Sequence, residues 1–431
     1  MSRRPESLPA VHEAWLPKEH ALHRPRHGGR QLTALIAAAV FFATPALLWV
    51  FGGRPAEIEN HKLAGFPGIS AGWRMFTGLP AWASDHLVFR EAAIDAADGI
   101  SRGLFGEPAP LGQGTGKNTG PLPGSTPKPA PPGETGPKGD SGSQRAVVGT
   151  DGWLYFGFDA EAKCSPARPF TDTVEKLGKL RAAVRDSGRR FVLAVAPDKT
   201  TMVPQHLPAN YPYKRCSRAV AAEFWRLITE QAGTLDLRDD LNSVARSLGH
   251  PLYFAKGTHW THMGAIVLTR ALAETLHPGI TKTWQAKPSG SFTSTADLPP
   301  MLGRQATRTG TIYELRPNGR IDRTVPGIGS IEEPVRHNAS PLNSTVNAQT
   351  LVLGDSFTLA SARYLPAGFS NLTMLSYTGI GSAGSRVIQE MVDAEVVVLQ
   401  VVERGLASGT VPVLAGDFIQ RVRQTLAAHP R

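Results

Sequence analysis

From residue 144 to the end of the chain, two kinds of apolar segment alternate. Short runs of consecutive apolar residues are typical of strands buried on both faces, and they occur at 191–197, 350–354, 371–377 and 395–402. Between them apolar residues recur at helical spacing, as at Val174, Leu177, Leu180 and Val184. A polar stretch with little periodicity, at about 287–347, interrupts the alternation. The pattern predicts an α/β domain at 144–431 with a doubly wound, mostly parallel sheet.

A different pattern lies near the N-terminus. Residues 32–51 form a run of twenty residues without a charge, and a helix of this length is enough to span a hydrocarbon core of about 30 Å. Basic residues precede this run, at Arg3, Arg4, Lys18, Arg24, Arg26 and Arg30. A cleaved signal peptide fits less well, because the run is too long and lacks a small-x-small cleavage site. We therefore expect a single transmembrane helix at 32–51, a cytoplasmic tail at 1–31 and an extracytoplasmic remainder.

Two segments separate this run from the α/β domain. Residues 52–106 place apolar residues at helical spacing and predict a helical stalk. Residues 107–143 differ, since eighteen of these 37 residues are Gly or Pro and none is aromatic. Such a composition cannot bury enough apolar surface to fold, so we expect a flexible linker.

The net charge indicates which kinds of binding partner to expect, and the cysteines indicate the cellular compartment. The net charge is +10, but Lys and Arg are scattered and form no stripe interleaved with aromatics, so nucleic acid is not the expected partner. An anionic membrane surface or glycan suits this charge better. The two cysteines, Cys164 and Cys216, lie in the segment placed outside the cytoplasm. We expect them to form a disulfide rather than two unrelated buried thiols.

Polar side chains follow several predicted strands, and in such sheets chemistry gathers at the carboxyl ends of the strands. Ser356 lies in "GDSF" after one strand and His259 lies in "THW" after another. A serine nucleophile needs an imidazole to accept its proton. The backbone N–H groups that open the helix at Ser356 would bind an oxyanion. Further candidates for oxyanion or substrate contacts are Gly379, Gly381, Trp260 and Arg404.

Each of these residues also has an ordinary structural interpretation. Ser356 would serve as a helix cap, His259 as a structural histidine, and Trp260 as a core aromatic. His259 and His262 lie three apart, but no third ligand is evident nearby, so we expect no metal site.

An ordered set of segments resembles the SGNH-hydrolase-like domain of the alginate O-acetyltransferase family. These segments are "GTDGWLYF" at 149–156, "APDK" at 196–199, "THW" at 258–260, "ADLPPML" at 296–302, "GDSF" at 354–357 and "VVERGL" at 401–406. The resemblance implies an extracytoplasmic enzyme that moves acetyl groups onto polysaccharide hydroxyls beside a multi-spanning membrane acyltransferase. It also implies Ser356 as nucleophile, His259 as general base, and no soluble cofactor.

The chain departs from the family at one position. The family pattern is Asp-x-His-Trp, whereas Gly257 stands at the Asp position here. Asp198 or Asp355 would supply the missing carboxylate, a Ser-His dyad would work without one, or the domain would be a non-catalytic polysaccharide-binding or assembly subunit. The same serine and histidine would also serve a carbohydrate acetyl esterase.

Overall fold

The computed structural model describes residues 29–51 and 146–431, apart from 303, together with the single residues 16, 19, 20, 66, 68, 75 and 82. Nearly all of the predicted stalk at 52–106 and the whole linker at 107–143 therefore lie outside the described residues. The helix α1 occupies Gly29–Val50. Among the described residues, no helix combines the length and apolar character needed to cross a membrane. The transmembrane helix predicted at 32–51 is thus not supported.

The α/β domain is built on a sheet of six strands in the order β4-β3-β10-β8-β9-β7. Five strands are parallel, and β7 pairs antiparallel with β9 at one edge. The predicted α/β class is confirmed, with a mixed sheet. The strands are β3 (Arg190–Ala196), β4 (Leu235–Asp236), β7 (Val335–Asn338), β8 (Thr350–Gly354), β9 (Asn371–Ser376) and β10 (Val396–Val402).

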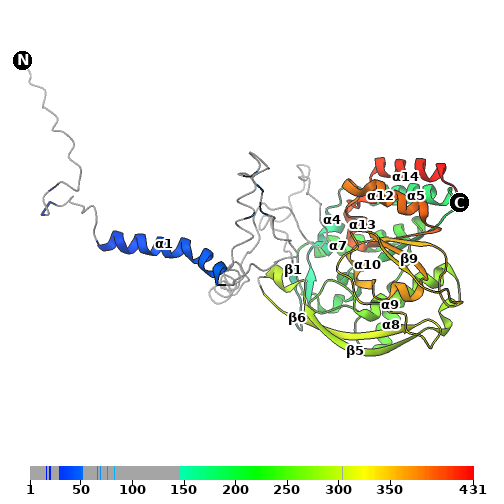
Figure 1. Ribbon diagram of the computed structural model, residues 1–431, viewed down its shortest axis with the longest axis horizontal. Coiled ribbons are helices and arrows are strands. Elements are labelled where there is room, and N and C mark those ends of the chain that lie inside the picture. The colour runs from blue at the N-terminus through cyan, green and yellow to red at the C-terminus, as the bar shows by residue number, and fades with distance from the viewer. Residues whose placement is uncertain are drawn as a thin grey trace, which may run out of the picture. The chain divides into compact units, whose positions relative to one another are not determined.

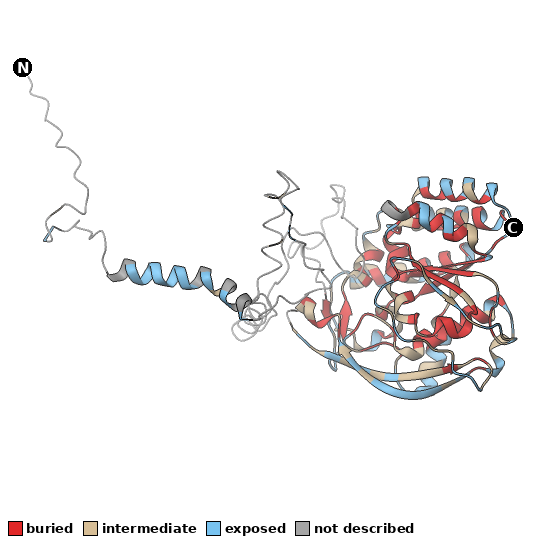
Figure 2. Cartoon of the chain, in the orientation of Figure 1, coloured by how far each residue is buried: buried red, intermediate tan, exposed pale blue. Residues whose placement is uncertain are grey.

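Alternate residues of each central strand contribute to two separate cores, because successive side chains point to opposite faces. In β10, Val397, Leu399 and Val401 pack with α5 (Phe170–Arg185), α12 (Ile380–Asp393) and α14 (Gly416–Ala428). Val396, Val398 and Val402 pack on the other face with α8 (Arg238–Leu248) and α9 (His262–Leu276). Figure 1 shows these two helical layers, and Figure 2 shows the buried sheet between them. Burial on both faces explains why the strands are almost continuously apolar.

Shorter elements complete the domain. The remaining α-helices are α4 (Phe158–Cys164), α6 (Lys199–Met202), α7 (Lys214–Arg226), α10 (Ser356–Ser361), α11 (Leu365–Gly368) and α13 (Glu403–Ser408). A π-helical turn extends α7 over Leu227–Gln231, and 3₁₀ turns occupy Pro204–His206, Ile280–Thr283, Pro299–Leu302 and Pro412–Leu414. A small antiparallel pair joins β1 (Ala146–Val148) to β2 (Leu154–Phe156).

The polar stretch that interrupted the sequence pattern forms a long antiparallel hairpin. Its strands are β5 (Gln285–Thr295) and β6 (Thr307–Arg316), visible along the lower rim of the domain in Figure 1. Strand β5 is mostly exposed and β6 is mostly half-buried, and the side chains of the hairpin give little apolar periodicity. Beyond its paired strands, Leu298 and Met301 pack with β1 and β2 in a small separate core. The segment after β5 is thereby fixed against the body of the domain.

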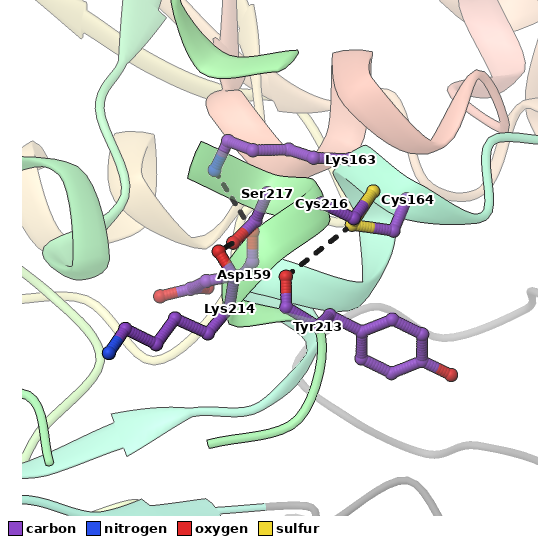
Figure 3. The surroundings of a disulfide bond; sticks show 7 residues. All are labelled: Asp159, Lys163, Cys164, Tyr213, Lys214, Cys216 and Ser217. Carbon is purple, nitrogen blue, oxygen red and sulfur yellow. Dashed lines mark hydrogen bonds between the residues drawn. A yellow bond between two sulfur atoms is a disulfide. The ribbon is translucent and has the colours of Figure 1, made fainter. Parts of the chain in front are cut away.

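The predicted disulfide between Cys164 and Cys216 is confirmed. It joins the last residue of α4 to the first turn of α7 (Figure 3). Asp159 and Lys163 of α4 belong to a buried group of charges described below, and Trp225 of α7 donates a hydrogen bond to Glu403 of that group.

Candidate active site

Ser356 is the first residue of α10, immediately after the carboxyl end of β8. The turn between them is tight, because a Cβ at Gly354 would lie 1.8 Å from Thr358 Oγ1. Only glycine fits there without displacing the helix. The turn holds Ser356 at the edge of the sheet in a partly exposed position.

Asp355, beside Ser356, is a structural residue. Its buried carboxylate accepts hydrogen bonds from Phe357 N (2.9 Å), the Tyr377 hydroxyl (2.9 Å) and Val402 N (2.7 Å). These bonds join the turn before α10 to the carboxyl ends of β9 and β10. They also engage the Phe357 N–H, one of the backbone donors that the sequence analysis assigned to an oxyanion. Asp355 therefore caps α10 and is not the carboxylate beside His259.

The loop that carries His259 packs directly against α10. The His259 ring lies 4.9 Å from the Phe357 ring, measured between centroids. Trp260 contacts Phe357 edge-on at 4.8 Å, and its Nε1 donates to Ser361 Oγ at 3.2 Å. The fold thus places His259 beside the residue that follows Ser356. The Nε2 atom of His259 is buried and has no hydrogen-bond partner among the described residues.

The carboxylate that faces His259 belongs to Asp297. Its Oδ2 lies 3.6 Å from His259 Nδ1. The side chains of Asp297 and His259 are 14% and 15% exposed, respectively. The Thr258 N–H donates to both carboxylate oxygens, each at 3.1 Å. Burial raises the pKa of Asp297, but hydrogen bonding and charge from His259, with Arg308 nearby, outweigh it and hold that pKa below its usual range. Asp297 is therefore an anion in contact with the imidazole.

Lys199 holds the backbone of the same loop. Its Nζ donates to the carbonyl oxygens of Phe254 (3.1 Å), Ala255 (3.2 Å) and Gly257 (2.7 Å). Burial lowers the pKa of Lys199 to about 7, despite the opposing attraction of Asp159 and Asp297. The "APDK" segment thus supplies the amine that holds the carbonyls preceding His259.

Asp198, the other carboxylate proposed from the sequence, belongs to a buried group of charges. It accepts from Lys163 at 3.2 Å and from Arg404 at 3.1 Å, and Arg404 also bonds Asp159 at 3.2 Å. Glu403 pairs with Lys163 at 2.9 Å. Burial raises the pKa of Asp198 well above its usual value. These ion pairs take up both carboxylate oxygens of Asp198, so it is not the partner of His259 either.

The other candidates differ in their position. Trp260 and Arg404 are only 2% and 0% exposed, so they pack beneath the surface and do not present a face to substrate. Gly379 caps α12 and Gly381 lies in its first turn, just beyond the carboxyl end of β9. Because β9 neighbours β8, the two glycines lie at the carboxyl end of the strand next to the one that precedes Ser356.

In the described part of the chain, no three His, Cys, Asp or Glu side chains gather in a way that would hold a metal ion.

Comparison with known proteins places this site in a family. Residues 146–377, more than half of the chain, match the SGNH hydrolase-like domain of the acetyltransferase AlgX. The chain belongs to this family. The matched region includes β1 through β9 and all of the side chains around His259 described above. Membership confirms the resemblance seen in the sequence segments.

Individual relatives of the AlgX family are similar over shorter stretches. The chain is 29% identical over 138 residues to the probable alginate O-acetylase AlgJ of Pseudomonas syringae pv. tomato, covering 31% of this chain and 34% of that one. It is 27% identical over 133 residues to AlgJ of Pseudomonas aeruginosa, covering 30% and 33%. The matched stretch is thus about a third of the length of these curated relatives. The solved O-acetyltransferase domain of Pseudomonas putida AlgJ aligns with a TM-score of 0.44 and 18% identity, over 65% of this chain and 99% of that one.

Proposed function

We propose that the protein is an O-acetyltransferase that moves acetyl groups onto polysaccharide hydroxyls through Ser356. The observation that carries the proposal is the contact between the rings of His259 and Phe357, the residue after Ser356, together with the Nε2 atom of His259, which has no hydrogen-bond partner among the described residues. A serine next to an imidazole with a free ring nitrogen is the arrangement that nucleophilic acyl transfer needs. Membership in the AlgX family and the name of the AlgJ relatives, probable alginate O-acetylases, support acetyl as the group and polysaccharide as the acceptor class.

The reaction has two steps. Ser356 Oγ attacks the acetyl carbonyl while His259 Nε2 accepts the hydroxyl proton, and the donor leaves with that proton as the acyl-enzyme forms. A sugar hydroxyl then attacks the acyl-enzyme, giving its proton to His259, which returns it to Ser356 Oγ. Transfer instead of hydrolysis requires the bound polysaccharide to exclude water from the intermediate.

The proposed setting is outside the cytoplasm. The Cys164–Cys216 disulfide supports it, because such bonds persist in oxidising compartments. We propose that a multi-spanning membrane acyltransferase supplies the acetyl groups and that residues 32–51, which carry no charge, attach the chain to the membrane. Carbonate extraction of cell membranes tests the attachment. The full chain is expected to stay in the membrane pellet, whereas a chain lacking residues 1–51 is expected to be released.

Turnover of a chromogenic acetyl ester by the full-length chain tests the function. Ser356→Ala is expected to abolish both turnover and covalent labelling by a serine-reactive phosphonate, and His259→Ala is expected to lower both by at least about 10³-fold. Ser340→Ala changes an exposed serine and serves as the matched control. Acetylation of an added polysaccharide supports transfer, whereas release of free acetate alone supports an esterase. Absence of both turnover and labelling would leave a polysaccharide-binding subunit.

A further inference from the structure

We propose that Asp297 is the positioning residue for His259 and replaces the carboxylate missing at Gly257. The proposal rests on the function proposed above and identifies the third member of its Ser-His site. It replaces the three alternatives left open by the sequence with one geometry. The carboxylate comes from the connection between the hairpin strands β5 and β6 and not from the loop that bears the histidine.

The space beside Gly257 is already filled by this carboxylate. A Cβ at Gly257 would lie 3.0 Å from Asp297 Oδ1 and 3.2 Å from Arg308 Nη1. A side chain at position 257 would therefore start in contact with the Asp297 carboxylate, at the place where the family pattern has its own Asp. Glycine at 257 and aspartate at 297 are thus complementary: one leaves the space that the other occupies.

Asp297 is fixed in place by the backbone on both sides of it. The Ala296 N–H donates to Ala306 O at 2.9 Å, and the Leu298 N–H donates to Lys256 O at 3.3 Å. The second of these bonds ties the segment after β5 directly to the His259 loop. Since Thr258 N also donates to both oxygens of Asp297, the carboxylate and the loop form one unit.

This arrangement assigns the two nitrogens of His259 to different tasks. Asp297 faces Nδ1, so the proton is held there and the lone pair is left on Nε2, which has no hydrogen-bond partner in the part of the chain that the structure describes. The 3.6 Å separation is an ion-pair distance, longer than a hydrogen bond, and contacts of this kind commonly shorten when substrate binds. The negative charge of Asp297 also stabilises the imidazolium that forms when His259 accepts the serine proton.

A carboxylate swap in the full-length chain tests the proposal. Asp297→Asn keeps the shape and an acceptor for Thr258 N but removes the charge, and it is expected to lower kcat by about 10²- to 10⁴-fold with little change in KM. Gly257→Asp alone is expected to lower kcat, because it brings a second carboxylate against the first. Gly257→Asp combined with Asp297→Ala is expected to recover at least about tenfold of the loss seen in Asp297→Ala, since it restores one carboxylate in the same space.

A spectroscopic measurement gives a readout that does not depend on turnover. The Nδ1 proton of His259 should appear in the downfield proton NMR region typical of imidazole protons held by carboxylates. The signal is expected to be lost in His259→Ala and Asp297→Asn and to return in the double variant. Thermal melting checks that each variant is folded, and Asp417→Asn, at an exposed aspartate, is the matched control.

The outcomes separate the two proposals. If Ser356→Ala and His259→Ala leave turnover unchanged, the proposed function fails. If those two abolish turnover while folded Asp297→Asn keeps the kcat and the downfield signal of the unaltered chain, only the role of Asp297 is overturned. Loss of turnover in Asp297→Ala without recovery in the folded double variant also contradicts it, because the lost group is then not an orienting carboxylate.

Discussion

At the scale of single residues, Asp355 shows that proximity in sequence to a nucleophile does not make a carboxylate part of its chemistry. The sequence placed Asp355 and Asp198 at the correct edge of the sheet, because both follow strands. It could not show that each would be fully engaged, Asp355 by two backbone N–H groups and a hydroxyl, and Asp198 by two cations. Those partners come from distant segments, and only the fold brings them together.

The role assigned to Asp355 predicts a loss of stability on substitution. Asp355→Ala leaves the N–H groups of Phe357 and Val402 buried without acceptors and is expected to lower the free energy of unfolding by about 3–5 kcal/mol. Tyr377→Phe removes only the third bond and should cost about 1–2 kcal/mol. Urea denaturation of the α/β domain, followed by tryptophan fluorescence, measures both. Equal losses in the two variants would contradict the account.

Asp297 is the residue that reasoning from the sequence missed. Its segment, "ADLPPML", was noted as part of the family resemblance, but no periodicity marked it as the connection of a hairpin. Ser356 and His259 were found because each lies in a short, recognisable motif. Ser356 follows a strand as predicted, but the strand predicted before His259 is only an isolated bridge between Tyr253 and Trp260. A carboxylate delivered by an exposed hairpin leaves no comparable signal, since neither spacing nor burial pattern links it to His259.

At the scale of elements, the loop before His259 depends on one buried lysine. Replacement of Lys199 by Met keeps the length and apolar stem of the side chain but removes three hydrogen bonds to loop carbonyls. Lys199→Met is expected to speed amide hydrogen exchange in residues 254–259 and to lower kcat, because the loop no longer holds His259 in one position. Unchanged exchange in this loop would show that other contacts fix it.

The lowered pKa of Lys199 predicts how stability changes with pH. The folded value is about 7, below the 10.5 of the unfolded chain, so between these values the unfolded state binds more protons. This contribution to stability is therefore present at high pH and is lost as the pH falls towards 7. The advantage of the unaltered chain over Lys199→Met in unfolding free energy is expected to grow from pH 7 to pH 9. An advantage that shrinks over this range would contradict the assignment.

The sequence correctly predicted the strands that are buried on both faces of the sheet, and it missed the partly exposed strands β5, β6 and β7. The runs of β8 and β10 are fully buried, so their apolar character alone identified them. In the hairpin, β5 is mostly exposed and β6 mostly half-buried, and the antiparallel edge strand β7 alternates between exposed and half-buried positions. Both were read as an irregular insertion, although the hairpin leads to Asp297.

At the scale of the whole α/β domain, alternating elements predicted the layers but not the order of the strands. The last strand, β10, lies at the centre between β3 and β8, with full-length pairing to β3. This insertion brings Glu403 and Arg404, which follow β10, against Asp198, which follows β3. The buried charges therefore link the carboxyl ends of β3 and β10, which are remote in sequence but adjacent in the sheet.

The disulfide acts on the domain in a different way from these charges. Cys164 ends α4 and Cys216 opens α7, and the bond closes a loop of 52 residues, which limits the freedom of the unfolded chain. Chain entropy for a loop of this length predicts a contribution of about 4 kcal/mol to the free energy of unfolding. The native contacts between the helices are expected to persist without it, because Lys163 on α4 and Trp225 on α7 both bond Glu403.

A double Cys164→Ser, Cys216→Ser variant should therefore unfold about 4 kcal/mol more easily in urea while its folded fraction keeps the ester turnover of the unaltered chain. Reductant should bring the unaltered chain to the stability of the variant and leave the variant unchanged, which is the internal control. Loss of turnover in variant molecules that remain folded would show that the bond also shapes the site. Equal stability with and without the bond would contradict the predicted contribution of about 4 kcal/mol. It would mean that other contacts already restrict residues 164–216 in the unfolded chain, so that the disulfide lowers the entropy of that state no further.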